Sequence, residues 1–161
     1  MNILVPGGAL RHVKAISQYI RDTLPTRVAD VMTKAVVTLS PDDNFTEAVE
    51  LMAGRDFRHL VVADDEQRLL GVISDRDILR ITGRGGDWQA KQIRHVMTAA
   101  PISVTAETLL SSAASTMVRK KINCLPVVDG DGIVCGIVTS TDILTCYQNT
   151  LEALESLRRD R

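Results

Sequence analysis

Two hydroxyl-carboxylate pairs have a spacing that could do chemistry. Ser74-x-x-Asp77 and Thr139-x-x-Asp142 each follow an apolar run typical of a strand and precede a stretch with helical spacing. In a capping box the hydroxyl accepts from the amide three residues on, and the carboxylate accepts from the cap amide. A helix N-terminus is also a ready anion site, and a carboxylate one turn in can accept hydrogen bonds from a ribose diol. Both interpretations stay open, and they are compatible without a ligand.

Other residue types that catalysis requires are not grouped in the sequence. An enzyme needs a nucleophile with a base, a paired acid and base, or a metal cluster. The histidines His12, His59 and His95 are scattered along the chain. The acidic turn 129–132 fails as a calcium loop, because Ile133 stands where an acidic ligand belongs. We therefore expect no enzymatic activity, no metal site and no required cofactor.

The cysteines point to a reducing compartment and to a packing role. Cys124, Cys135 and Cys146 are odd in number and form neither a CxxC motif nor a zinc-like spacing. We interpret all three as small buried apolar residues.

Composition narrows the class of protein further. Over 161 residues, 45% are apolar and 24% charged, as in ordinary globular chains, and only 3% are aromatic, which gives little base-stacking surface. A net charge of −1 without a long basic run argues against a nucleic-acid partner. No apolar stretch has the length of a membrane helix, and the first residues lack the features of a signal peptide. We expect a cytoplasmic protein that binds neither nucleic acid nor membranes.

A repeat with a period of 65 residues organises the chain. Val31-Met32-Thr33 recurs as Val96-Met97-Thr98, and segment 71–79 recurs as 136–144 without a gap between. Each copy is too short to bury its own core comfortably, so the two copies should pack together. The duplication also puts the two hydroxyl-carboxylate pairs at matched positions.

Each copy has the pattern of a β-α-β-β-α unit, which predicts an α+β fold. In the first copy a strand over 36–39 precedes a helix with Ser40 at the N-cap, Pro41 at N1 and Asp43 at N3. Apolar residues at i, i+3, i+4 and i+7 give this helix one buried face: Phe45, Ala48, Val49 and Met52.

The rest of the copy is a hairpin and a second helix. Runs 60–63 and 69–73 are typical of strands around an acidic turn, and the corresponding turn 129–132 of the second copy is a stronger hairpin signal. The second helix begins at Ser74 and ends at Gly83, a C-cap residue.

Three segments lie outside the copies. Residues 9–24 predict an amphipathic helix, the last helix extends past the repeat, and 83–87 resembles the start of a phosphate loop but follows a helix, which favours a linker. We divide the chain into an N-terminal extension (1–27), repeat one (28–82), a linker (83–92), repeat two (93–145) and a C-terminal helix extension (146–161).

The motifs together resemble a tandem pair of CBS domains, the Bateman module. They are the doubled V-M-T, the run Leu125-Pro126-Val127-Val128-Asp129, and the closing pattern G-h-h-[S/T]-x-x-D-I-L of each copy, in which h is an apolar residue. The resemblance covers residues 28–145. It departs mildly in the first copy, where Val61 stands in place of the usual Pro and Arg58-His59 precede it.

The resemblance implies two copies packed about a pseudo-two-fold axis, with ligand clefts between them. The ligand would contain adenosine, as in AMP, ADP, ATP or S-adenosylmethionine. The first cleft would use Thr139, Thr141, Asp142, Val36, Val37, Arg58 and His59. The second would use Ser74, Arg76, Asp77, Ile102 and Asn123.

The resemblance also implies a regulatory role. With no enzyme segment in the sequence, we expect a stand-alone module that signals to an unidentified effector protein in trans. The family habit and the apolar terminal helices predict a homodimer. The alternative is a protein-interaction module with vestigial, ligand-free clefts.

Overall fold

The computed structural model describes residues 24–55 and 57–159. The helix predicted within residues 9–24 lies, apart from Leu24, outside this part of the chain. No helix of the described residues is long and apolar enough to cross a membrane.

Both copies follow the predicted β-α-β-β-α order, which makes the fold α+β. The elements of the first copy are β1 (Thr38–Leu39), α2 (Phe45–Arg55), β2 (His59–Ala63), β3 (Leu69–Ser74) and α3 (Asp75–Thr82). Those of the second are a single parallel bridge from Val104 to Val127, then α4 (Leu110–Lys120), β5 (Cys124–Val128), β6 (Val134–Thr139) and α5 (Ser140–Arg159). Short 3₁₀ helices, η1 (Val28–Asp30) and η2 (Ile93–His95), precede the copies.

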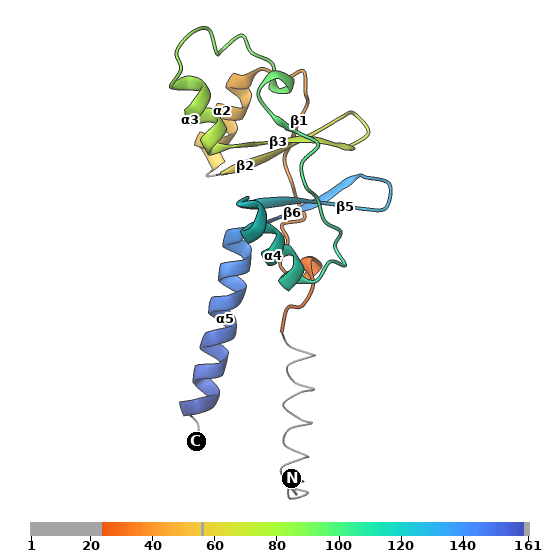
Figure 1. Cartoon of the computed structure of the whole chain (residues 1–161), viewed down its shortest axis with the longest axis vertical. Helices are drawn as coiled ribbons and strands as arrows, with labels where there is room; N and C mark the ends of the chain where they lie inside the picture. The colour runs from red at the N-terminus through yellow and green to blue at the C-terminus, as the bar shows by residue number, and fades with distance from the viewer. Residues whose placement is uncertain (1–23, 56, 160–161) are drawn as a thin grey trace, which may run out of the picture.

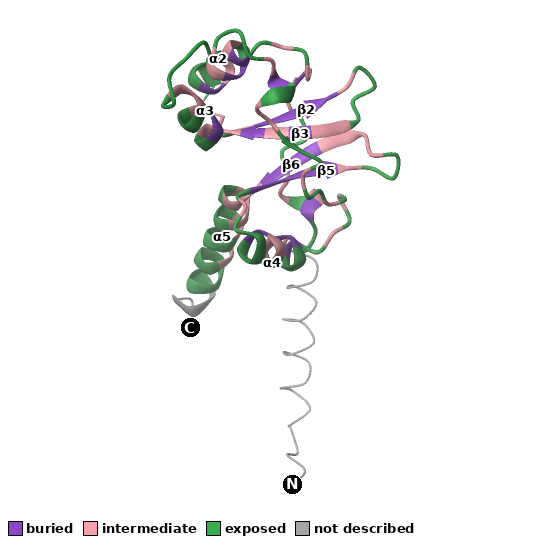
Figure 2. Ribbon diagram, turned by 45° about the horizontal axis from the view of Figure 1, so that its top comes forward, coloured by how far each residue is buried: buried purple, intermediate pink, exposed green. Residues whose placement is uncertain are grey.

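The two hairpins lie face to face between the helices. Figure 1 shows β2 and β3 beneath α2 and α3, with β5 and β6 next to them and α4 and α5 on the far side. Backbone hydrogen bonds also join the hairpin loops, from Leu69 N to Gly132 O (3.1 Å) and from Val134 N to Gln67 O (2.9 Å). The copies therefore share one interior layer, and α5 extends away from it with most of its length exposed (Figure 2).

The V-M-T segment of each copy pairs with a strand of the other copy. The strand β4 (Thr98–Ala99) pairs antiparallel with β3, which sets Thr98 opposite Val72. Thr33 correspondingly forms a two-way backbone bridge to Ile137, with N···O distances of 2.9 and 3.0 Å. This exchange ties the start of each repeat to the hairpin of its partner repeat.

The predicted start of the first helix is wrong. Residues 40–43 form a turn in which Ser40 N donates to Asp43 Oδ2 (2.7 Å), and α2 begins only at Phe45. The reason is tertiary pairing, because Ile93 N donates to Asp43 O (2.9 Å) and Phe45 N donates to Lys91 O (2.8 Å). The linker thus uses backbone groups that an earlier helix would have needed.

The core has one cluster in each copy and one between them. Phe45, Ala48 and Met52 are buried on α2 as predicted, and Val49 packs partly buried against them. The middle cluster joins Val61 of the first copy to Ile137 and Cys124 of the second. Burying such side chains stabilises by about 1.5 to 3 kcal/mol each, so the copies depend on each other for their cores.

The cysteine prediction holds for one residue of three. Cys124 is buried, whereas Cys135 and Cys146 are only half-buried. Burial raises the pKa of the Cys124 thiol to about 12, and Asp77 adds to this effect. Cys124 therefore behaves as the small apolar residue that the sequence suggested.

We predict that Gly71→Ala destabilises the fold by about 1 to 3 kcal/mol. A Cβ at this position would lie 2.5 Å from Met97 Sδ and 3.1 Å from Thr98 O, so the exchanged segment would have to shift. Gly54→Ala in α2 is the matched control: its Cβ meets nothing within 4 Å, and we expect a gain of about 0.5 to 1 kcal/mol. Urea denaturation measures both variants. Equal stability of the two would show that Met97 and Thr98 yield without cost.

Candidate functional site

The N-terminus of α5 carries the hydroxyl-carboxylate pair of Thr139 and Asp142 as a capping box. Asp142 Oδ2 accepts from Thr139 N and from Thr139 Oγ1, both at 2.7 Å, while Asp142 N donates to Thr139 Oγ1 at 3.3 Å. Both bonds to the carboxylate use the same oxygen, Oδ2. Within the described residues no hydrogen bond reaches Oδ1, which leaves it able to accept from a ligand.

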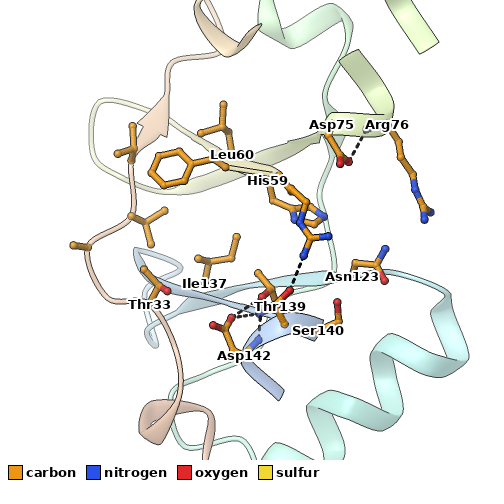
Figure 3. Close-up of a pocket in the computed structure, with 16 residues that line it drawn as sticks. Thr33, His59, Leu60, Asp75, Arg76, Asn123, Ile137, Thr139, Ser140 and Asp142 are labelled. Carbon is orange, nitrogen blue, oxygen red and sulfur yellow. Dashed lines mark hydrogen bonds between the residues drawn. The ribbon is translucent and has the colours of Figure 1, made fainter. Parts of the chain in front are cut away.

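A cavity of about 560 Å³ lies beside this helix start, between the two copies. Figure 3 shows Thr139, Ser140 and Asp142 of the second copy on one side and His59, Asp75 and Arg76 of the first copy on the other. The volume falls in the range of small-molecule sites. The residues that line it are Thr33, Ala35, Val36, Val37, Phe57, Arg58, His59, Leu60, Asp75, Arg76, Asn123, Ile137, Thr139, Ser140, Thr141 and Asp142.

One side-chain hydrogen bond crosses the cavity. Arg58, directly before β2, donates from Nη2 to Thr141 Oγ1 in the first turn of α5 at 2.6 Å. Both side chains are exposed, so a ligand can reach the same guanidinium. An arginine in this position can grip an anion that enters beside the helix start.

His59 gives the cavity a group whose charge depends on pH. Burial lowers the pKa of His59 below its ordinary value of 6.5. The nearby carboxylates of Asp75 and Asp77 act in the opposite direction, whereas Arg58 and Arg76 reinforce the lowering. The imidazole is therefore neutral at pH 7.

The hydroxyl-carboxylate pair of Ser74 and Asp77 has the same capping geometry but a different environment. Asp77 Oδ2 accepts from Ser74 N (2.9 Å) and Ser74 Oγ (2.7 Å) at the start of α3. Its other oxygen, Oδ1, is taken by a salt bridge from Arg80 Nη2. Asp77 is 9% exposed, so both of its oxygens are engaged inside the protein.

Most of the site residues predicted from the sequence line one cavity, and they do not divide into two clefts as expected. All seven residues assigned to the first cleft line the cavity, and Arg76 and Asn123 from the second set line it too. Ser74, Asp77 and Ile102 lie outside it. Whether any of these residues contacts a ligand stays a prediction.

Several lining residues were missed by the sequence reasoning. Thr33, Asp75 and Ser140 lie within motifs already singled out, but none of them was assigned to a cleft. Phe57, Leu60 and Ile137 carried only the signal of core residues. Among the described residues, no group of three or more His, Cys, Asp or Glu side chains is placed to hold a metal ion.

Comparison with known proteins identifies the family. The family model of the CBS domain matches residues 28–83 and 93–149. The chain belongs to the CBS-domain family. The two matches coincide with the two copies of the repeat, and the resemblance seen in the sequence is confirmed.

Solved structures share this fold along nearly their whole length. CBSX2 of Arabidopsis thaliana, in complex with AMP, is 29% identical with a TM-score of 0.72, covering 78% of this chain and 98% of that one. The acetoin utilization protein AcuB of Vibrio cholerae is 33% identical with a TM-score of 0.72, covering 81% and 96%. The CBS domain pair of protein MJ0100, in complex with 5′-methylthioadenosine and S-adenosyl-L-methionine, is 28% identical with a TM-score of 0.72, covering 78% and 99%.

Curated relatives match over a smaller share of their own length. Inosine-5′-monophosphate dehydrogenase of Methanocaldococcus jannaschii is 30% identical over 138 residues, which are 85% of this chain and 27% of that enzyme. The enzyme of the same name from Mycobacterium tuberculosis is 36% identical over 121 residues, 74% and 22% respectively. The chain thus spans about a quarter of the length of these relatives.

We predict that the free energy of unfolding falls as the pH drops below about 6.5 and is level above it, as far as His59 is concerned. The unfolded chain takes up a proton at His59 below this pH, whereas the folded protein, with a lowered pKa, resists it. Urea midpoints at about pH 7.5 and pH 5.5 measure the effect.

The variant His59→Gln should lose this part of the pH dependence, and His95→Gln, which removes an exposed histidine, should keep it. Identical pH dependence in the wild-type protein and His59→Gln would contradict a half-buried, neutral His59.

Proposed function

We propose that this chain is a regulatory module that binds an adenosine-containing ligand in the cavity between its two CBS repeats. The observation that carries the proposal is the free Oδ1 of Asp142 at the wall of that cavity. Because the carboxylate makes its capping bonds through Oδ2 alone, Asp142 can accept from a ribose diol without giving up the cap of α5.

The rest of the cavity suits the other parts of a nucleotide. Ser140 and Thr141 supply hydroxyls and backbone amides at a helix N-terminus, which favours a phosphate. Arg58 and Arg76 add cations from the opposite repeat. The apolar segment 35–37, together with Ile137, offers a surface for a flat base.

The ligands of similar proteins support adenosine as the shared element. CBSX2 was solved with AMP, and the MJ0100 domain pair with 5′-methylthioadenosine and S-adenosyl-L-methionine. We place AMP, ADP and ATP ahead of S-adenosylmethionine, because the arginines face where a phosphate would lie. No further cofactor is needed in this proposal.

Signalling follows from the bond that spans the cavity. A phosphate beside Thr141 would compete for the Arg58 guanidinium, which now holds the first repeat to the second. Ligand binding would therefore change how the two repeats are joined, and an effector protein in trans could sense the change. The effector, the cytoplasmic location and the absence of nucleic-acid or membrane binding stay predictions from the sequence.

We predict that Asp142→Asn weakens AMP binding by roughly ten- to a hundredfold, because a charge-assisted hydrogen bond contributes about 1.5 to 3 kcal/mol. Asparagine keeps the size and one acceptor, so the helix cap is largely retained. Asp77→Asn is the matched control and should leave AMP affinity unchanged, since Asp77 Oδ1 is already bonded to Arg80. Calorimetry on the three proteins gives the affinities.

Undiminished AMP binding by Asp142→Asn would overturn the ribose role. A thermal-shift panel in which AMP, ADP, ATP and S-adenosylmethionine all leave the melting temperature unchanged would favour the alternative, a protein-interaction module with ligand-free clefts.

We also propose that the chain forms a homodimer through α5. Four large apolar side chains spaced along one stripe of this helix are exposed: Leu144 (65%), Tyr147 (61%), Leu151 (39%) and Leu154 (47%). A two-fold contact would bury this stripe on both copies. Light scattering should give about twice 17.6 kDa, and Tyr147→Glu with Leu151→Glu should halve that mass. A wild-type mass of 17.6 kDa would refute the dimer.

A further inference from the structure

A second concave site lies at the C-terminal end of α3 and carries three cationic side chains and a histidine. It has a volume of about 430 Å³ and is lined by Arg80, Ile81, Arg84, Gly85, Lys91, His95 and Val96. We call it the basic groove. It shares no residue with the cavity between the repeats, and no acidic residue lines it.

Backbone hydrogen bonds and one aromatic contact position the segments that carry these cations. Arg80 and Arg84 lie one helical turn apart, and the chain continues as turns in which Arg84 N donates to Ile81 O (3.3 Å). Lys91 is placed by its carbonyl, which accepts from Phe45 N at 2.8 Å. The linker between them is anchored because Trp88 packs edge-on against Phe45, with ring centroids 5.9 Å apart.

The charge of the groove is only partly neutralised within the described residues. Arg80 pairs with Asp77, which orients its guanidinium, whereas Arg84 and Lys91 form no salt bridge there. Like charges gathered on one surface repel each other. Binding of an anion to such a cluster relieves this repulsion.

The duplication shows that this charge is not required by the fold. A matching groove of the second copy lies 65 positions away and is lined by Thr145, Cys146, Asn149, Thr150, Asp30 and Val31, among others. These residues correspond in order to Arg80, Ile81, Arg84, Gly85, His95 and Val96. The shape is therefore repeated, but the second copy has no lining cation and carries the carboxylates of Asp30 and Asp142.

We propose that the basic groove is a second binding site, for a small polyphosphate anion of the pyrophosphate or tripolyphosphate class. The volume fits a small molecule, and several cations suit an anion with several charged oxygens. No aromatic side chain lines the groove for stacking on a base. A chain with net charge −1 also lacks the extended basic surface that a nucleic acid needs.

The test is calorimetry of the full chain with inorganic tripolyphosphate. The double variant Arg84→Asn with Lys91→Thr introduces the residue types found 65 positions away, at Asn149 and Thr26. It should weaken binding about tenfold or more. The control Arg119→Asn with Lys120→Thr removes the same charges from the exposed end of α4 and should keep the wild-type affinity.

Competition separates the two sites of the protein. Tripolyphosphate should bind equally well with and without saturating AMP, and Asp142→Asn should not affect it. Displacement by AMP would place the anion in the cavity between the repeats and overturn the proposal. An equal loss in both double variants would show general charge attraction only, and absence of binding by the wild-type protein would also overturn it. The comparison of the two double variants does not depend on whether AMP binds at Asp142.

Discussion

The exchange of the V-M-T segments is the constraint on which the rest of the structure depends. Each segment pairs with the other copy's hairpin at a glycine, and a methionine fills the space that a Cβ would need. Met97 lies against Gly71, and Met32 lies against Gly136. A larger residue at either glycine would push the segment away. The copies can interlock because both positions lack a Cβ.

The cavity is a consequence of this interlocking. Once Thr33 is bonded to Ile137, the chain that follows must run along the hairpin of the second copy, past the start of α5, before it reaches its own sheet at Thr38. The cavity therefore has walls from both copies, and neither copy could form it alone. The cavity therefore lies at the junction between the repeats.

Local patterns in the sequence were sufficient for some features and not for others. The repeat, the buried face of α2 and both capping boxes follow from side-chain periodicity and short-range hydrogen bonding, which the sequence displays directly. The late start at Phe45 and the salt bridge of Arg80 with Asp77 depend on partners or rotamers that a linear pattern does not display. The ligand role of the predicted site residues is a question of chemistry that geometry alone leaves as a proposal.

Because the chain is duplicated, comparing matched positions of the two copies shows which features the fold requires. The two halves follow the same order of elements, so a feature dictated by folding should occur in both, as the capping boxes do. Features in only one half have been retained or gained independently of the fold. Asp142 keeps a free oxygen because Thr145 stands where the first copy has Arg80, and the same arginine contributes to the basic groove beside α3. One difference between the copies thus gives Asp77 a salt bridge and adds a cation to the groove of the first repeat, whereas Asp142 Oδ1 accepts no hydrogen bond from the described residues.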